Sequence, residues 1–280
     1  MAGLGGPVAS RSRRAMGAMV PLDRAAIARA LNSAGLTIEV ADTVDSTNSE
    51  LLRRAGGTHI HRHLLVAEWQ TAGRGRRGRG WSAVAGGSLT FSLGWRFEQG
   101  AERLVGLSLA VGVALARVLD ASGYHGIELK WPNDLVHEGR KLGGILIESS
   151  GDALGPIHAV VGVGLNVRLP AEIHREVGVP ITDLTSIAET KAIDRNALLA
   201  HLAADLAIAL ESYSTEGFAA FRSQWRNRDA LRDQRVQVLL PDGSTILGVA
   251  AGVDADGALL VERNGRRLRF VNGEVSVRRT

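Results

Sequence analysis

The chain has 280 residues, with 33 basic and 29 acidic residues, a net charge of +4 and 45% hydrophobic residues. This composition excludes a disordered chain and is typical of a globular protein with one large and one small domain. The absence of cysteine excludes disulfides, thiolate zinc sites and thiol nucleophiles, and no apolar run approaches the roughly 18 residues of a membrane span.

The first 20 residues predict a disordered tail. They contain Arg11, Arg13 and Arg14 but no acidic residue, and they lack the apolar stretch of a secretory signal. Met16 and Met19 are alternative starts, and a transit peptide is a second interpretation of these residues. Because the chain lacks both a secretory signal and cysteine, we expect a cytoplasmic protein.

The first regular elements are a helix at residues 24–34, capped by Asp23 and ended by Gly35, and a strand at residues 36–44. Further along, three histidines alternate at His59, His61 and His63. On a strand they would share one face, which suggests a metal site. No acidic or thiolate partner lies beside them, so we favour exposed histidines at a loop edge.

Residues 45–48 read Asp-Ser-Thr-Asn and predict the start of a short helix that ends at Gly56. The side chains of Asp45, Ser46 and Thr47 are all suitable helix N-caps. The same helix start, lined with hydroxyls and an amide, is also suited to bind a polar ligand. The residues alone favour the cap and leave the ligand site open.

Residues 73–81, here called the RG segment, read GRGRRGRGW and contain four glycines, four arginines and no acidic residue. The like charges predict a mobile segment until an anion neutralises them, and arginine matches carboxylate and phosphate oxygens. We interpret the RG segment as a clamp that folds over a small phosphorylated or carboxylated ligand. A nucleic-acid-binding loop and a surface loop without a ligand are the alternatives.

A dinucleotide-binding fingerprint also has to be considered, because Gly73, Gly75 and Gly78 have the G-x-G-x-x-G spacing. That fingerprint requires a strand before it and a helix after it. Residues 63–69 predict the strand, but residues 88–97 alternate between apolar and small side chains and predict a second strand. The flanking residues therefore argue against a dinucleotide fold.

A long apolar helix is predicted at residues 102–122. Two strands follow at residues 127–130 and 141–148, joined through a turn at 137–140. Pro132 interrupts the first of these strands, because proline cannot donate to the ladder.

The interruption brings together a cation, an amide and a carboxylate, at Lys130, Asn133 and Asp134. An ordinary Pro-Asn-Asp turn explains the same residues, and this stretch alone does not decide between the two interpretations.

The chain uses arginine almost everywhere and has only three lysines, Lys130, Lys141 and Lys191. Lysine at 130 and 141 therefore suggests a specific need for an ammonium group, with chance placement as the alternative.

A buried strand is predicted at residues 157–168, with Asn166 near its end as a turn residue or a ligand contact. Helical patterns follow at residues 194–213 and 215–227. After residue 230, five short strands separated by tight turns predict a small β-barrel. These strands lie at residues 235–240, 245–253, 259–263, 267–271 and 275–278.

Four motifs in one order along the chain closely resemble those of biotin protein ligases. They are DSTN at 45–48, QTAGRGRRGRGW at 70–81, KWPNDL at 130–135 with RKLGGILIE at 140–148, and GVGLNV at 162–167. Each motif is weak alone, but four at compatible spacings are specific. The resemblance is strong over residues 36–170, and the C-terminal module shares its architecture and its closing VNGEVSVR.

The resemblance implies an α+β fold. Its catalytic domain has a mixed, mainly antiparallel sheet with helices, similar to class II aminoacyl-tRNA synthetases, and a small SH3-like β-barrel follows. We expect a tail at residues 1–20, the catalytic domain at 21–230 and the SH3-like domain at 231–280. The resemblance also implies that biotin and ATP with Mg²⁺ form biotinyl-5′-adenylate and pyrophosphate. A lysine of a carboxylase's biotin carboxyl carrier domain then attacks the adenylate.

The resemblance further implies roles for individual residues. Lys141 matches the family's active-site lysine, and Arg74 is assigned to catalysis with it. The implied biotin-binding residues are Ser46, Thr47, Asn48, Gln70, Arg74, Gly75, Arg76 and Lys141. The implied nucleotide-binding residues are Arg77, Arg79, Trp81, Lys130, Asn133, Asp134 and Asn166. No direct metal ligand is assigned.

The N-terminus departs from part of the family. Some members carry a helix-turn-helix repressor domain before the catalytic domain. Here a tail and one predicted helix precede the strand at residues 36–44 and the DSTN motif, which is too little for that domain. We therefore expect no specific DNA binding and no membrane association, and a monomer or homodimer. A lipoate or octanoate ligase or transferase of the same fold is the alternative enzyme.

Overall fold

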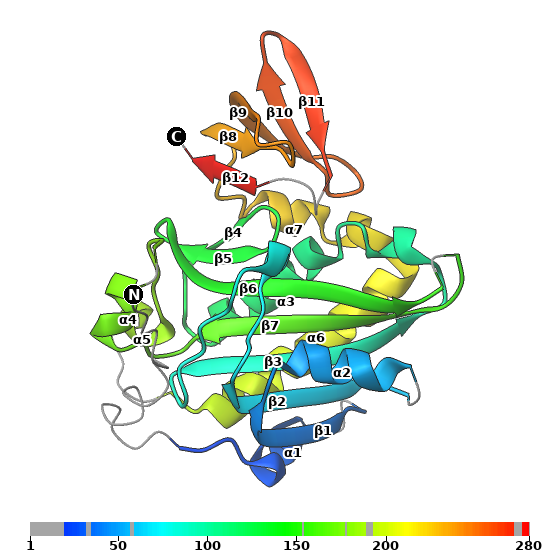
Figure 1. The fold of residues 1–280 in the computed structure, drawn as a ribbon, viewed down its shortest axis with the longest axis vertical. Coiled ribbons are helices and arrows are strands. Elements are labelled where there is room, and N and C mark those ends of the chain that lie inside the picture. The colour runs from blue at the N-terminus through cyan, green and yellow to red at the C-terminus, as the bar shows by residue number, and fades with distance from the viewer. Residues whose placement is uncertain are drawn as a thin grey trace, which may run out of the picture.

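The computed structural model describes residues 20–31, 35–56, 59–152, 154–176, 178–188, 193–271 and 276–279. Most of the expected tail, with Met1, Met16 and Met19, lies outside the described residues, as do Lys191 and residues 272–275 of the closing motif. The described residues form two sheets, and most of the helices pack around the larger one (Figure 1).

The larger sheet has seven strands in the order β1-β2-β3-β7-β6-β5-β4. β1 and β2 pair in parallel, and the other neighbouring strands pair antiparallel. The mixed, mainly antiparallel sheet expected from the sequence is therefore confirmed. Its strands are β1 (Thr37–Val44), β2 (His63–Gln70), β3 (Ser88–Phe97), β4 (Ile127–Lys130), β5 (Asp134–His137), β6 (Arg140–Gly151) and β7 (Ile157–Asn166).

Helices cover both faces of this sheet. In Figure 1, α2 lies in front of the strands, whereas α3 and α6 lie behind them. The patterns at residues 194–213 and 215–227 correspond to α6 and to the short η5 and α7. The helices are α1 (Arg24–Leu31), α2 (Thr47–Ala55), α3 (Leu107–Ala121), α4 (Ala171–Glu176), α5 (Leu184–Ile187), α6 (Arg195–Glu216) and α7 (Arg222–Arg226), with 3₁₀ turns η3 (Arg76–Gly78), η4 (Ala101–Leu104) and η5 (Gly217–Ala220).

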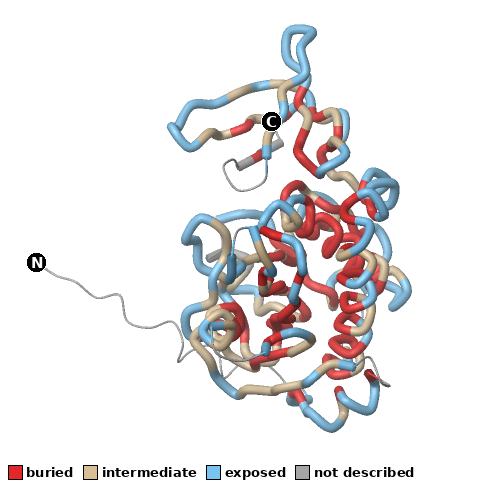
Figure 2. Tube along the Cα trace, turned by 90° about the vertical axis from the view of Figure 1, so that its right-hand side faces the viewer, coloured by how far each residue is buried: buried red, intermediate tan, exposed pale blue. Residues whose placement is uncertain are grey.

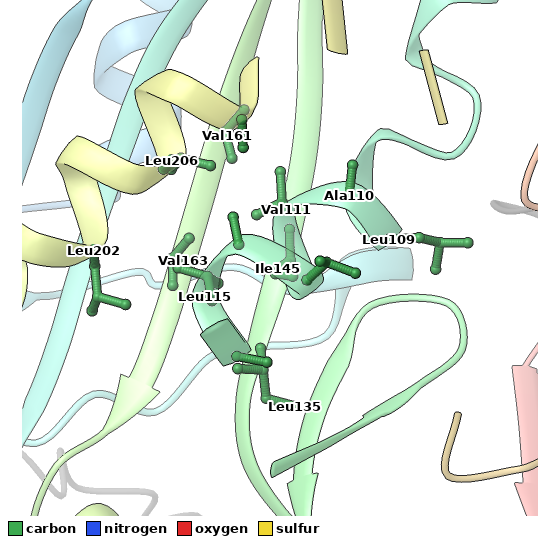
Figure 3. Packing of buried hydrophobic residues seen from close by; sticks show 14 of the residues in the cluster. Leu109, Ala110, Val111, Leu115, Leu135, Ile145, Val161, Val163, Leu202 and Leu206 are labelled. Atoms are coloured by element: carbon green, nitrogen blue, oxygen red, sulfur yellow. The ribbon is translucent and has the colours of Figure 1, made fainter. Parts of the chain in front are cut away.

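Alternating side chains along the strands supply a core for each face. On β2, Leu64 and Val66 belong to the larger core, whereas Leu65 belongs to a smaller core with Leu51 of α2. Figure 3 shows side chains from α3, α6 and β7, among them Val163, packed together in the larger core. Buried segments are concentrated in the interior of the larger part of the molecule, and exposed segments lie on its outside (Figure 2). The period-two pattern of the sequence therefore sets both cores.

The helix predicted at residues 102–122 is shorter than expected, because α3 begins at Leu107. Gly106, just before it, has a φ of 80°, and a Cβ there would lie 2.7 Å from the carbonyl oxygen of Asp256. The left-handed φ and the close approach of Asp256 both favour glycine at position 106, and the helix begins only after it. Ala101–Ala121 is long and apolar enough to span a membrane, but 72% of its most apolar window is buried inside the protein.

The interruption at Pro132 is a chain reversal, not a break within one strand. β4 ends at Lys130, residues 131–133 form a turn, and Asp134 begins β5 directly opposite Lys130. A second turn at residues 138–139 leads into β6, so three antiparallel strands occupy the region where the sequence predicts two. A turn is a position where a residue without a backbone N–H is tolerated.

The five strands predicted after residue 230 form the smaller sheet, in the order β11-β10-β9-β8-β12. Its turn between β9 and β10 contacts the larger domain. There the Gly257 carbonyl accepts a hydrogen bond from Trp131 Nε1 at 3.0 Å, and a Cβ at Gly257 would lie 2.9 Å from Leu109. The strands are β8 (Arg235–Leu239), β9 (Thr245–Val253), β10 (Leu259–Arg263), β11 (Arg266–Phe270) and β12 (Ser276–Arg279).

Candidate active site

A cavity of about 370 Å³ lies between the start of α2, the RG segment, β6, β7 and residues 178–181. Of the residues assigned from the sequence, all but Arg77 and Lys130 line it. The lining members of that set are Ser46, Thr47, Asn48, Gln70, Arg74, Gly75, Arg76, Arg79, Trp81, Asn133, Asp134, Lys141 and Asn166. The fold thus gathers four motifs that are far apart in the chain around one volume.

The start of α2 forms a polar floor. Ser46 is the N-cap, and its hydroxyl accepts a hydrogen bond from the Ser49 amide, so the predicted cap is confirmed. The Thr47 amide and hydroxyl both donate to Gln70 Oε1, at 2.8 and 3.1 Å. Ser46 and Thr47 are buried yet line the cavity, so these residues cap the helix and also face the ligand space.

Asn48 links this floor to the RG segment. Its Oδ1 accepts from Ser92 Oγ at 2.6 Å, and its Nδ2 donates to Leu146 O at 3.2 Å and to Glu148 Oε2 at 2.9 Å. Glu148 also contacts Arg74, whose Nη2 lies 2.7 and 2.8 Å from the two carboxylate oxygens. Sequence reasoning assigned no role to Glu148, although it is the last residue of the RKLGGILIE motif.

The RG segment folds back on itself beside the cavity. The Trp81 N–H donates to Gly73 O at 2.9 Å, and the Gly75 N–H donates to Arg79 O at 2.7 Å. η3 forms its tip, where Arg77 has a φ of 58° and does not line the cavity. β3 follows the segment, so the helix that a dinucleotide fingerprint needs is not found there.

Two glycines of β7 leave room for cavity side chains. A Cβ at Gly162 would lie 2.1 Å from Asn48 Oδ1, and a Cβ at Gly164 would lie 2.4 Å from the Trp81 indole. The two glycines are two residues apart and therefore share one face of the strand. Both glycines belong to the GVGLNV motif, but the sequence predicts no role for either of them. The sequence nevertheless contains an indication of this role, because a glycine inside a buried strand often marks a place where another part of the protein or a ligand comes close to the backbone.

Arg76 presents an incompletely satisfied cation to the cavity. Its Nη1 donates to Asn133 Oδ1 at 3.3 Å, and its Nη2 is buried without a hydrogen-bond partner in the described part of the chain. Burial lowers the pKa of Arg76, while the charge of Asp134 raises it. An anionic ligand would supply the missing acceptor and offset the cost of burial.

Lys141 presents a second cation to the cavity, and both its side chain and its backbone have interaction partners. Its Nζ donates to Asp134 Oδ1 at 2.6 Å and lies 5.8 Å from the centre of the Trp81 ring. Its backbone N–H donates to Pro180 O, and its carbonyl accepts from the Thr182 N–H, both at 2.9 Å. Segment 180–182 therefore fixes the start of β6, while the flexible lysine stem reaches the cavity.

The nucleotide side assigned from the sequence is only partly assembled. Asn133 and Asp134 line the cavity, whereas Lys130 does not, and burial lowers the pKa of Lys130. Asn166 lines the cavity at the end of β7 and donates its Nδ2 to Thr182 O at 3.0 Å. Asn166 therefore supports the wall of the site as well as facing it.

No group of three or more histidine, aspartate or glutamate side chains suited to a metal ion occurs within the described ranges. His59 and His61 are exposed, and His63 Nε2 instead contacts Glu39 at 3.1 Å. Mg²⁺ that arrives with a nucleotide needs only one or two protein carboxylates. Asp134 is the carboxylate among the cavity-lining residues, so the site fits a phosphate-bound ion better than a metal held by protein alone.

Comparison with known proteins assigns this arrangement to a family. Residues 40–166 match the model of the biotin/lipoate A/B protein ligase family, and residues 233–278 match the biotin protein ligase C-terminal domain. The bifunctional ligase/repressor BirA of Escherichia coli is 38% identical over 247 residues, which cover 87% of this chain and 75% of that protein. The biotin–[acetyl-CoA-carboxylase] ligase of Mycobacterium tuberculosis is 35% identical over 263 residues, covering 91% of this chain and 95% of that protein.

A solved structure shows the same fold. The Aquifex aeolicus biotin protein ligase in complex with biotin and ATP aligns with a TM-score of 0.73 and 27% identity, covering 87% of this chain and 99% of that chain. The mixed sheet, the separate antiparallel sheet and the polar, cationic cavity are consistent with the protein ligase family whose model residues 40–166 match. The chain belongs to the biotin/lipoate A/B protein ligase family, as one of its biotin protein ligases.

Proposed function

We propose that this enzyme activates biotin with ATP as biotinyl-5′-adenylate and then transfers the biotinyl group to a lysine of a biotin carboxyl carrier domain. The carrier belongs to acetyl-CoA carboxylase or a related carboxylase, as the name of the Mycobacterium tuberculosis relative suggests. The observation that supports the proposal most is that one cavity combines an uncharged polar floor with the cations Arg76 and Lys141.

The floor suits the ring system of biotin, a cyclic urea with N–H donors and a carbonyl acceptor. Thr47, Asn48 and Gln70 offer amide and hydroxyl groups held by hydrogen bonds to neighbours. Preorganised donors and acceptors lose little entropy on binding. We therefore assign Ser46, Thr47, Asn48 and Gln70 to the ring, and Arg74, Gly75, Arg76 and Lys141 to the carboxylate end.

The first step joins two anions. The biotin carboxylate attacks the α-phosphorus of ATP, the bond to the bridging oxygen breaks, and pyrophosphate leaves. The biotin carboxylate and the phosphates of ATP repel each other. Two cations of the cavity are suited to offset this repulsion and the negative charge of the transition state. They are the incompletely hydrogen-bonded guanidinium of Arg76 and the ammonium of Lys141. Arg77, Arg79, Trp81, Lys130, Asn133, Asp134 and Asn166 are proposed for the nucleotide side.

When Mg²⁺ is bound with ATP, it neutralises phosphate charge. Asp134 is suited to contact it, because Lys141 occupies only Oδ1 of the carboxylate. The RG segment then excludes water from the adenylate, a mixed anhydride that water would otherwise hydrolyse. In the second step the carrier lysine attacks the acyl carbon, and AMP leaves.

We further propose that residues 21–230 act as the catalytic domain and residues 231–280 as the smaller C-terminal domain, after a tail at residues 1–20. The contact between Trp131 and Gly257 joins the two domains next to the turn that carries Asn133. The smaller sheet thereby supports the turn on the nucleotide side.

The direct test is to incubate the protein with biotin, ATP, Mg²⁺ and an apo carrier domain, and to measure the intact mass of the carrier. One added biotinyl group and stoichiometric pyrophosphate are expected. A parallel reaction with lipoate tests the alternative, since the matching family model includes lipoate ligases. A carrier that gains lipoyl but not biotinyl would replace the proposal with that alternative.

A further inference from the structure

Glu148 occupies a position between the two parts of the cavity that must act together. It lies on β6, and its carboxylate contacts Asn48 of the floor at 2.9 Å and Arg74 of the RG segment at 2.7 and 2.8 Å. The Glu148 side chain is 25% exposed and the Arg74 side chain 45% exposed. Glu148 itself is not among the cavity-lining residues, so it acts through its two partners.

Toward the floor, Glu148 sets the orientation of an amide. Asn48 Nδ2 donates to Glu148 Oε2 and to Leu146 O, which leaves Asn48 Oδ1 to accept from Ser92. A carboxylate can only accept, so it excludes the flipped amide in which Oδ1 would face Glu148. Glutamine at position 148 could donate as well, which would weaken that restriction and leave it to the Leu146 carbonyl.

Toward the RG segment, Glu148 holds the base of a folded loop. The Arg74 backbone forms a β-bridge with Gly80, so the position of Arg74 sets the position of both arms of the segment. A half-exposed ion pair contributes little to the stability of a whole protein. We expect the Glu148–Arg74 ion pair to act instead on the equilibrium between the open and the closed RG segment, because a small free-energy change is enough to shift that equilibrium.

We propose that Glu148 is a positioning residue that keeps the RG segment closed over the activated biotin and keeps Asn48 in its ligand-binding orientation. The inference rests on the proposed function. When the segment opens before transfer, water attacks the acyl carbon of biotinyl-5′-adenylate and releases biotin and AMP. Each such event consumes one ATP and yields one pyrophosphate without a biotinylated carrier.

The experiment compares pyrophosphate released with carrier biotinylated, for the wild type and for Glu148→Gln, in one reaction with biotin, ATP, Mg²⁺ and apo carrier. The wild-type ratio is expected to be about one. For Glu148→Gln we expect the ratio and the KM for biotin to rise roughly twofold to fivefold, the range that an ion pair of this exposure supports. Glu148→Asp, which keeps the charge but shortens the reach, should change both in the same direction.

Glu98→Gln is the matched control, because Glu98 pairs with Arg96 at 3.1 Å and neither residue lines the cavity. A purely structural role for Glu148 would lower the unfolding temperature and slow both products equally, leaving the ratio at the wild-type value. That result, or a KM for biotin equal to that of Glu98→Gln, would overturn the inference. Failure of the wild type to release pyrophosphate with biotin would instead overturn the proposed function.

Discussion

Lys141 and Arg76 both present a cation to the cavity, but their charges are balanced differently. Lys141 pairs with Asp134 at 2.6 Å, whereas Arg76 contacts the neutral amide of Asn133. Two unit charges about 4 Å apart interact by about 4 kcal/mol at an effective dielectric of 20. Loss of Lys141 therefore removes an attraction for the ligand anion and also leaves Asp134 facing that anion.

We predict that Lys141→Ala lowers biotin-dependent pyrophosphate release by about a thousandfold, the factor that corresponds to about 4 kcal/mol. Lys141→Arg should also fail, because a planar guanidinium fork is bulkier than an ammonium and its donors are fixed. Circular dichroism checks the fold. Arg140→Ala, which changes an exposed residue paired with Glu138, is the control. Near-normal turnover by folded Lys141→Ala would contradict the assignment of Lys141 to adenylate formation.

Gly164 tests whether the place of Trp81 matters. A Cβ at Gly164 would lie 2.4 Å from the indole, so Gly164→Ala forces Trp81 to move. We expect the KM for ATP to rise at least about tenfold, with about 1–3 kcal/mol of lost stability from overpacking. Steady-state kinetics and urea unfolding measure the two effects. Gly56→Ala, where an added Cβ meets nothing within 4 Å, should change neither. Unaltered ATP kinetics in Gly164→Ala would argue against Trp81 as a ligand contact.

At the scale of elements, the RG segment contains no buried residue. Its residues from Arg74 to Gly80 are exposed or half-buried, and backbone hydrogen bonds across its own two arms form most of its structure. Segments with few buried contacts open at low free-energy cost. An anion that engages Arg76 would add a contact that the open segment lacks.

Limited trypsin digestion is predicted to cleave the free protein at Arg76 or Arg77, and cleavage there should slow severalfold when biotin and ATP are both present. The physical reason is that a ligand bound to the closed state alone reduces the open fraction. Mass spectrometry of the fragments gives the site and rate. Cleavage elsewhere, such as at the exposed Arg235 of β8, serves as the internal control. Equal rates at the RG segment with and without ligands would contradict a lid.

At the scale of the whole molecule, the chain that joins the two domains extends the larger sheet. Leu129 of the edge strand β4 donates to Arg228 O at 2.7 Å and accepts from the Ala230 N–H at 3.0 Å. Asp229 lies between these bonds, with Oδ1 accepting from the Leu231 N–H at 3.0 Å and Oδ2 buried without a described partner. Burial raises the pKa of Asp229 from 3.8 to about 6.

The raised pKa makes the stability of this junction depend on pH. The folded state binds the proton of Asp229 more tightly than the unfolded state does. Protonated Asp229 therefore adds to the free energy of unfolding, and this contribution is fully present below about pH 4 and is lost as pH rises through about 6. We predict that Asp229→Asn removes this loss and increases the free energy of unfolding at pH 8 by up to about 3 kcal/mol, with a smaller change at pH 5. Urea unfolding at both pH values measures it. Asp42→Asn, on the exposed part of β1, is the control, and equal pH dependence in both variants would rule out Asp229 as the cause.

The sequence by itself determined the elements whose physics is local. Alternation of apolar and small residues predicts β3, and side chains next to a helix start predict the Ser46 cap, because both depend on residues a few positions apart. The tight turns after residue 230 likewise predict five short strands. The motifs that line the cavity were also recognisable from the sequence, because their order and spacing along the chain resemble those of biotin protein ligases.

Only the tertiary structure decided which distant residues meet. Glu148 contacts Asn48 across 100 positions of sequence, and no local pattern records that contact. The same holds for Gly106, which has a left-handed φ just before α3 and which the backbone of Asp256, 150 positions later in the chain, approaches closely. It also holds for Lys130. The resemblance of the KWPNDL motif implies that Lys130 binds the nucleotide, but Lys130 does not line the cavity. The order of the strands in the larger sheet decides which residues become neighbours. β7 lies between β3 and β6, and this order depends on how side chains from the whole chain pack, not on the residues of any one strand.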